Sequence, residues 1–169
     1  MNVSKLNESE IETYISIHNN ILHIRKKGFE KKYFVSNYYK NYDIGIELIL
    51  SKCKEVLDSF DKIDYDISKW YVEFQQRNCG FEKKAKRTFD WHVDDYATVS
   101  YKVYTIIFYL RKDITIEGGN LEYKLKKKTF TQKIEGGDIL CFDGNIKHRP
   151  EVCDGMGCRD TIVVFIKRK

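Results

Sequence analysis

The sequence has little proline and no long apolar segment. It contains one proline and ten glycines in 169 residues, which leaves little material for flexible linkers. Its longest apolar runs, 104–110 and 161–166, are far too short to cross a bilayer as helices. The N-terminus also lacks the apolar core of a signal peptide. We therefore expect a single domain over residues 1–169, outside the membrane and in a cytoplasmic or nuclear location.

The cysteines lack the spacing of a disulfide framework or a zinc site. There are five, an odd number, and no two of them form a CxxC pair. Such a pattern predicts reduced thiols that are small buried residues or incidental ones. These residues are Cys53, Cys79, Cys141, Cys153 and Cys158.

The charge is positive but not extreme. The formal net charge is +5, which permits binding to nucleic acid or to an acidic partner without requiring it. Lysines alternate with tyrosines over residues 25–43, and a second basic stretch covers residues 82–87. The first segment could stack on and neutralise a single-stranded nucleic acid. The second is predicted to be a loop before the metal-binding strand, either near the substrate mouth or, as we favour, on the solvated surface. For residues 25–43 we favour the alternative, exposed lysines that lie beside half-buried rings.

Two segments in the first third of the chain have helical periodicity. Apolar residues recur at the helical spacing over 7–24, where Asn7 or Ser9 is a suitable cap, and again over 44–60. His18 and His23 lie five residues apart on the first helix, which is not the spacing of two metal ligands on one helix face. We expect residues 1–66 to form a helical support region.

From Trp70 onward the apolar period changes from the helical spacing to two. Short apolar or alternating segments then follow one another, separated by glycine-containing turns. The expected fold class is therefore mainly β with N-terminal helices (α+β), with a jelly roll over residues 67–169. The predicted strands are 70–77, 101–111, 121–126, 129–134, 139–142, 148–153 and 159–167.

A candidate metal site begins at His92 and Asp94. In an extended segment, side chains two residues apart project to the same side, so this imidazole and this carboxylate face one metal ion, and Asp95 faces away. His148 is the natural third ligand, after enough chain for several strands. Two histidines and one carboxylate on one face of an iron ion leave room for a co-substrate and dioxygen. Arg159, on the next strand, has the guanidinium group that suits a dicarboxylate.

This ordered set of motifs resembles the Fe(II)/2-oxoglutarate-dependent dioxygenase superfamily. The resemblance covers the C-terminal half to three-fifths of the chain and combines the HxD pair, His148 and an RxT motif. The strings 104–110, 118–121 and 137–142 are similar to the prolyl-hydroxylase-like branch. The resemblance implies a double-stranded β-helix fold.

The resemblance also implies roles for individual residues. His92, Asp94 and His148 would bind Fe(II), and Arg159 would hold the C5 carboxylate of 2-oxoglutarate. Thr161 and Tyr109 would contact the same end of the co-substrate, and Leu121 would form a wall of its pocket. The reaction implied is hydroxylation of a C–H bond with O2, releasing succinate and CO2, with ascorbate as a further small molecule to test.

Three functions of different classes remain open. The first is a hydroxylase acting on a protein side chain or on a small metabolite. The second is an oxidative demethylase of nucleic acids of the AlkB type, suggested by the lysine-rich composition. The third is a cupin-like protein that binds a metal or ligand without catalysis. The sequence leaves both monomer and homodimer open.

Overall fold

The computed structural model describes residues 1–23, 29–31, 34–39, 43–61, 63–80 and 89–169. The basic stretch 82–87 and parts of the lysine-and-tyrosine segment 25–43 lie outside these residues. Both interpretations of each segment therefore remain predictions.

Helix α1 spans Glu8–His23 and begins at a capping box. The Asn7 side chain accepts a hydrogen bond from the Glu10 N–H (2.9 Å), and the Glu10 carboxylate accepts one from the Asn7 N–H (2.8 Å). The apolar positions of the helix then recur on one side, where Tyr14 and Ile21 are buried. The helix predicted over residues 7–24 is confirmed.

Helix α2 spans Ile44–Asp58 and confirms the second predicted helix. Its N-cap, Asp43, accepts a hydrogen bond from the Ile46 N–H at 2.9 Å. A wide apolar face is buried against the sheet, and Lys52 forms an ion pair with Glu10 of α1 at 2.8 Å. The buried apolar residues of this helix are Ile46, Ile49, Leu50, Cys53, Val56 and Leu57.

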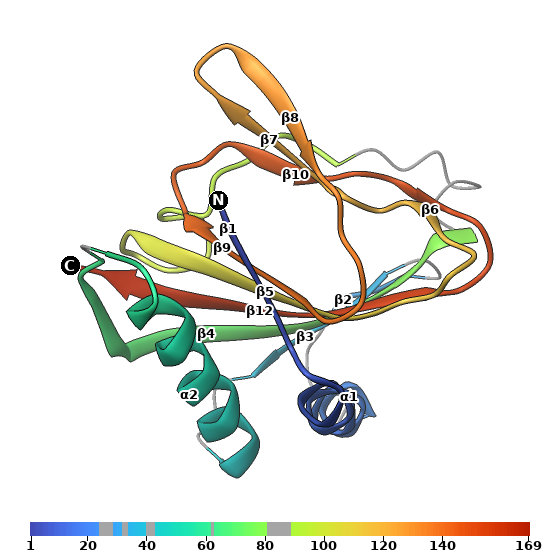
Figure 1. Cartoon of the computed structure of the whole chain (residues 1–169), viewed down its shortest axis with the longest axis horizontal. Coiled ribbons are helices and arrows are strands. Elements are labelled where there is room, and N and C mark those ends of the chain that lie inside the picture. The colour runs from blue at the N-terminus through green and yellow to red at the C-terminus, as the bar shows by residue number, and fades with distance from the viewer. Residues whose placement is uncertain (24–28, 32–33, 40–42, 62, 81–88) are drawn as a thin grey trace.

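A seven-stranded sheet forms the larger layer of the molecule. Its strand order is β1-β9-β5-β12-β4-β3-β2, and every pairing within it is antiparallel. Both helices lie on its outer side, below the sheet in Figure 1. The strands are β1 (Asn2–Lys5), β2 (Phe29–Lys31), β3 (Phe34–Tyr39), β4 (Tyr65–Asn78), β5 (Val103–Lys112), β9 (Asp138–Asp143) and β12 (Cys158–Arg168).

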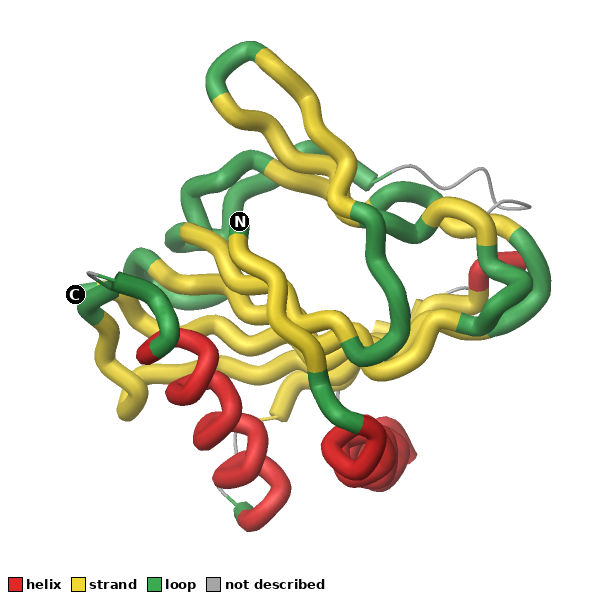
Figure 2. Tube along the Cα trace, viewed as in Figure 1, coloured by secondary structure: helices red, strands yellow, loops and turns green. Residues whose placement is uncertain are grey.

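A smaller layer of strands lies opposite the sheet, and the β7–β8 hairpin projects from it (Figure 2). It contains the order β10-β7-β8, from β7 (Leu121–Leu125), β8 (Lys128–Gln132) and β10 (His148–Pro150). A separate antiparallel pair joins β6 (Glu117–Gly118) to β11 (Cys153–Asp154). Two facing antiparallel layers after an N-terminal helix form a jelly roll, as predicted.

Apolar side chains pack on both faces of the large sheet. One cluster fills the space between the helices and the outer face, and includes Val72 and Phe74 of β4. A second cluster lies between the two layers and includes Leu140 and Phe165. The alternate residues of β4, Glu73, Gln75 and Arg77, line a cavity inside the jelly roll. The sequence predicts that one face of this strand lies in the core. In the structure, the other face forms a polar wall of the cavity rather than a solvent-exposed surface.

The N-terminal region contributes strands as well as helices. Strand β1 pairs with β9 at one edge of the sheet, with Asn2 opposite Cys141, and β2 and β3 extend the other edge. Four residues without apolar alternation carry no strand signal of their own, so the sequence does not predict β1. Because β4 begins at Tyr65, the expected boundary between residues 66 and 67 falls inside a strand.

The prediction that all five cysteines are reduced is wrong. Cys79, directly after β4, forms a disulfide with Cys153 of β11, and both residues are fully buried. The two are 74 residues apart in sequence, and only the packing of the two layers brings their Cα atoms to 4.8 Å. The odd count arises because Cys53, Cys141 and Cys158 stay free. The bridge also removes the cysteine argument for a reducing compartment.

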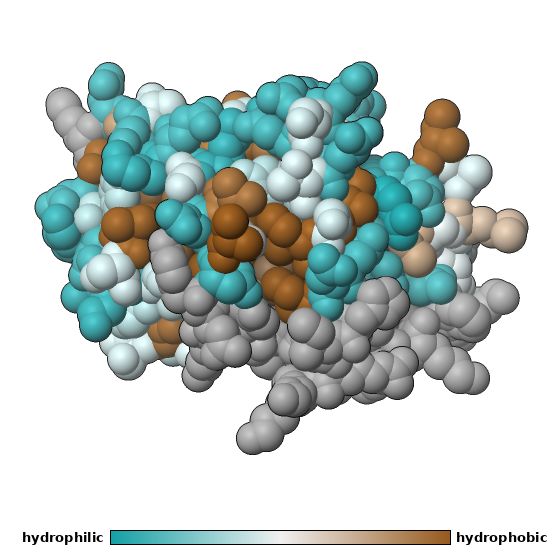
Figure 3. Space-filling view, turned by 90° about the horizontal axis from the view of Figure 1, so that it is seen from below, coloured by the Kyte–Doolittle hydropathy of each residue, from teal (hydrophilic) through white to brown (hydrophobic). Residues whose placement is uncertain are grey.

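The outer helical face is mixed in polarity. Figure 3 views this side of the molecule and shows apolar atoms near its centre, with polar residues above and beside them. On α2, Ile44 and Leu48 are exposed. Within the described residues, neither helix is long and apolar enough to span a membrane.

Candidate active site

A short backbone bridge places two of the predicted ligands side by side. The His92 N–H donates to the His148 carbonyl (3.0 Å), and the His148 N–H donates to the His92 carbonyl (2.9 Å). The following turn is held by the Asp94 N–H, which donates to the Gly144 carbonyl at 2.7 Å. Residues far apart in sequence therefore meet through main-chain hydrogen bonds.

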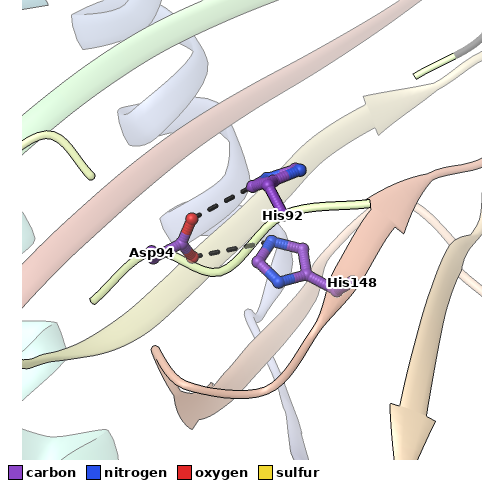
Figure 4. Close-up of side chains that lie close together, drawn as sticks. All are labelled: His92, Asp94 and His148. Carbon is purple, nitrogen blue, oxygen red and sulfur yellow. Dashed lines mark ion pairs between the residues drawn. The ribbon is translucent and has the colours of Figure 1, made fainter. Parts of the chain in front are cut away.

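The three side chains converge on one small volume. The Nε2 atom of His92 lies 3.8 Å from Oδ1 of Asp94, and Nε2 of His148 lies 3.5 Å from Oδ2. Figure 4 shows the two imidazoles approaching the two oxygens of this carboxylate. One ligand atom from each residue lies within 4.8 Å of the other two, and His148 and Asp94 are buried while His92 is about half exposed.

Hydrogen bonds hold both imidazoles in the form that binds a metal. The Nδ1 atom of His92 lies 3.0 Å from the Asp90 carbonyl, and Nδ1 of His148 lies 2.9 Å from the Ile146 carbonyl. A carbonyl only accepts, so each Nδ1 carries a proton, and Nε2 is the ring nitrogen left to bind a metal beside Asp94. Burial lowers the pKa of His148, and the nearby Asp94 carboxylate opposes this effect. The neutral ring is the form that ligates metals.

The two adjacent aspartates have different surroundings. Thr105 of β5 donates a hydrogen bond from its hydroxyl to Oδ2 of Asp94 at 2.6 Å, and both residues are buried. Asp95 points the other way, and its Oδ1 accepts the Val103 N–H at 2.9 Å. Asp94 therefore faces the histidines, while Asp95 holds the loop to the start of β5.

All seven residues predicted for the site line one cavity of about 340 Å³. The metal-ligand candidates lie at one part of its wall, and Arg159 of β12 is buried at another, with only 3% of its surface exposed. The seven are His92, Asp94, Tyr109, Leu121, His148, Arg159 and Thr161.

The arginine end of the cavity is enclosed by the glycine turn before β7. The Arg159 guanidinium donates from Nη1 to the Gly119 carbonyl and lies 5.3 Å from the centre of the Tyr109 ring. Gly119 has φ +67°, and a Cβ there would approach the Cys153 Cβ at 3.1 Å. Glycine at this position therefore allows the turn to pass close to both β11 and the arginine.

Several residues that line the cavity were not predicted as site residues from the sequence. Thr105 occupies an ordinary position in an apolar strand, and nothing in its local sequence marks it as a partner of Asp94. Glu73, Gln75 and Arg77 could have been suspected from a polar row on a strand that is apolar on its other face. The Gln75 amide donates to the Glu73 carboxylate within this row.

Comparison with solved structures identifies the fold. A prolyl-4-hydroxylase from Pseudomonas putida matches with a TM-score of 0.65 and 10% identity over 99% of this chain and 92% of that chain. The chain has the fold of the prolyl-hydroxylase-like 2OG-Fe(II) oxygenases. An oxidoreductase of the 2OG-Fe(II) oxygenase family from Burkholderia pseudomallei matches at 0.70, with 10% identity over 97% and 80% of the two chains.

A third similar structure contains a bound peptide. It is a prolyl hydroxylase from Trichoplax adhaerens in complex with a fragment of hypoxia inducible factor, with a TM-score of 0.65 and 14% identity over 99% and 83% of the two chains. No protein-family model and no curated protein sequence matches this chain. At these identities the likeness establishes the 2OG-Fe(II) oxygenase fold, and function depends on the site itself.

Proposed function

We propose that this protein is an Fe(II)- and 2-oxoglutarate-dependent dioxygenase that hydroxylates a C–H bond of a protein side chain or small metabolite. The observation that carries the proposal is one cavity with a two-histidine, one-carboxylate cluster on its wall and a buried arginine at another part of the same wall. The peptide bound to the Trichoplax prolyl hydroxylase makes a protein side chain the first substrate class to test.

The donor set fits Fe(II). His92 and His148 offer neutral imidazole nitrogens, and Asp94 offers a carboxylate oxygen that Thr105 holds in place. Fe(II), 2-oxoglutarate and O2, when bound, supply the oxidising chemistry and release succinate and CO2. The protein's task is to bind and orient these groups and to limit the entry of water.

The other predicted residues form the co-substrate pocket in this proposal. Arg159 binds the C5 carboxylate of 2-oxoglutarate through its planar fork, because a buried guanidinium binds a carboxylate strongly. Thr161 and Tyr109 direct hydroxyl groups toward the same end, and Leu121 forms an apolar wall beside the carbon chain.

An anaerobic titration with Fe(II) and 2-oxoglutarate tests the proposal. The expected result is a visible charge-transfer absorption band from the co-substrate chelated to iron. Arg159→Ala should weaken 2-oxoglutarate binding while iron binding persists. If iron binds and no band forms, the cupin-like alternative replaces the proposal. If the band forms and only oligonucleotides stimulate succinate release, the nucleic-acid demethylase replaces it.

The adjacent aspartates provide a matched pair of variants for the metal site. Asp94→Asn should abolish Fe(II) binding, because it replaces a carboxylate ligand that faces both histidines. Asp95→Asn should keep iron affinity, because that side chain bonds to the Val103 N–H instead. Calorimetric titration with Mn(II) or Fe(II) measures both. Equal loss in the two variants would contradict the proposed ligand set.

A further inference from the structure

The cavity contains a second buried arginine. Arg77 of β4 lines the same cavity as Arg159, and only 1% of its surface is exposed. Burying a guanidinium costs free energy unless an anion or several acceptors surround it. Two guanidinium groups on the wall of one cavity provide positive charge for an anionic ligand.

The strand register places both arginines at one end of the cavity. Arg77 on β4 and Arg159 on β12 are directly opposite each other, and adjacent strands lie about 4.8 Å apart. Tyr109 lies on β5, on the other side of β12, opposite Thr161. Three neighbouring strands therefore present two guanidinium groups and a phenol to the same end of the cavity. Burial raises the pKa of Tyr109, and the positive charges of Arg159 and Arg77 both oppose that rise, so both arginines act on its side chain.

This end is distant from the metal-ligand candidates. Thr105, which donates to Asp94, lies four residues before Tyr109 on β5. Four residues of a strand span roughly 13 Å. The five-carbon chain of 2-oxoglutarate and an arginine side chain that reaches toward it can together cover this distance. A carboxylate at the arginine end would therefore be the distal one.

Arg77 is held in a defined orientation. Its Nη2 donates to the Glu151 carbonyl at 2.9 Å, and its guanidinium lies over the Phe89 ring, 4.6 Å from the ring centre. The Cys79–Cys153 disulfide joins the two segments that make the Glu151 contact, because Cys79 follows Arg77 by two residues and Cys153 follows Glu151 by two. This arrangement restricts the guanidinium before any ligand binds.

We propose that Arg77 binds the C5 carboxylate of 2-oxoglutarate together with Arg159, so that two arginines recognise the distal end of the co-substrate. The inference rests on the proposed function and deepens it by adding a residue that determines specificity for a dicarboxylate. The predicted site does not include Arg77, and in it Arg159 alone supplies the positive charge that binds the distal carboxylate. The consequence is selectivity for 2-oxoglutarate over 2-oxo acids that lack the second carboxylate.

The test compares two ligands in the Mn(II)-loaded protein without oxygen, by calorimetry. 2-Oxoglutarate has the distal carboxylate, and 2-oxopentanoate has a methyl group in its place. Arg77→Met should weaken 2-oxoglutarate binding by about tenfold or more, since hydrogen bonds to charged groups are worth roughly 1.5–3 kcal/mol. Its affinity for 2-oxopentanoate should stay unchanged. Arg77→Lys should show a smaller loss for the same ligand alone, because a single ammonium replaces the fork.

Arg111→Met is the matched control. Arg111 is an arginine of β5 that pairs with Asp160 at 3.0 Å and does not line the cavity, so this variant should bind both ligands as the unmodified protein does. If Arg77→Met fails to fold, the ligand selectivity of Arg77→Lys decides the question. Wild-type selectivity in an Arg77 variant, or equal weakening of both ligands, overturns the inference.

Failure of the underlying function would look different. If the unmodified protein binds 2-oxoglutarate no better than 2-oxopentanoate, recognition of the distal carboxylate is absent, and the roles of both Arg159 and Arg77 fall. A different outcome would rule out the role of Arg77 alone. In it, the unmodified protein and Arg77→Met both discriminate between the two ligands, and Arg159→Lys does not.

Discussion

Thr105 shows how one hydroxyl group influences a metal site at the scale of a single residue. Its oxygen lies 2.6 Å from the Asp94 carboxylate, and both residues are buried. Partners of this kind orient the groups that bind the metal and are not ligands themselves. The carbonyl groups of Asp90 and Ile146 do the same for the two histidines. The candidate site is therefore preorganised by its neighbours.

Replacing Thr105 with valine should weaken metal binding without unfolding the protein. Valine keeps the branched shape, but it leaves the Asp94 oxygen without its donor and free to rotate. We expect the Fe(II) or Mn(II) affinity to fall by about 10–100-fold, measured by calorimetry. Thr131→Val on the exposed face of β8 is the control and should bind metal normally. Unchanged affinity in Thr105→Val would show that the hydroxyl does not support the carboxylate.

At the scale of elements, polar contacts join the two helices to each other. Glu10 accepts the Asn7 N–H at the start of α1 and also pairs with Lys52 of α2. The hydrogen bond from Lys52 lowers the pKa of Glu10 below its ordinary value near 4.5. One carboxylate therefore caps α1 and connects α1 to α2.

Glu10→Ala should destabilise the protein by about 1 kcal/mol at neutral pH, as measured by urea unfolding. Because the pKa of Glu10 is lower in the folded state, its contribution is complete above the unfolded value. It is lost as pH falls through the folded value, so the difference between the two proteins should shrink in acid. Glu12→Ala, at an exposed position of α1, should have little effect at either pH. A difference that grows in acid would contradict this assignment.

At the scale of the whole molecule, the disulfide joins the large sheet to the β6–β11 pair at the arginine end. It connects the residue directly after β4 to β11, which pairs with β6 in a separate two-stranded sheet. The bond closes a long loop and so restricts the unfolded chain. It also holds together the segments that orient Arg77, which couples stability of the fold to the shape of the cavity.

Replacing both Cys79 and Cys153 with serine should lower the free energy of unfolding by about 2–4 kcal/mol. Reductant should destabilise the unmodified protein by a similar amount and leave the double variant unaffected. Thiol titration in denaturant provides a direct check, since the unmodified protein should expose three free thiols, Cys53, Cys141 and Cys158, before reduction and five after it. Five thiols without reductant would show that the bridge is absent.

Local patterns were sufficient for much of the fold and the candidate ligand set. The helical period predicted α1 and α2, and the period of two predicted the main strands, because each pattern reflects which side of one element is buried. His92 and Asp94 could be paired from their spacing alone. Their convergence with His148 and Arg159 followed from a resemblance in the order of motifs along the chain.

Other features depend on strand register between distant parts of the chain, which only the tertiary structure decides. The pairing of β1 with β9, the bridge between Cys79 and Cys153, and the hydrogen bond from Thr105 to Asp94 each join residues whose own sequence contexts are ordinary. Arg77 looked like one polar residue in an alternating strand until the register placed it opposite Arg159. Sequence alone determined which residue types could bind iron and a dicarboxylate. The packing of two β layers decided which of them share a cavity, because shifting a strand by one residue would turn every side chain to the other face.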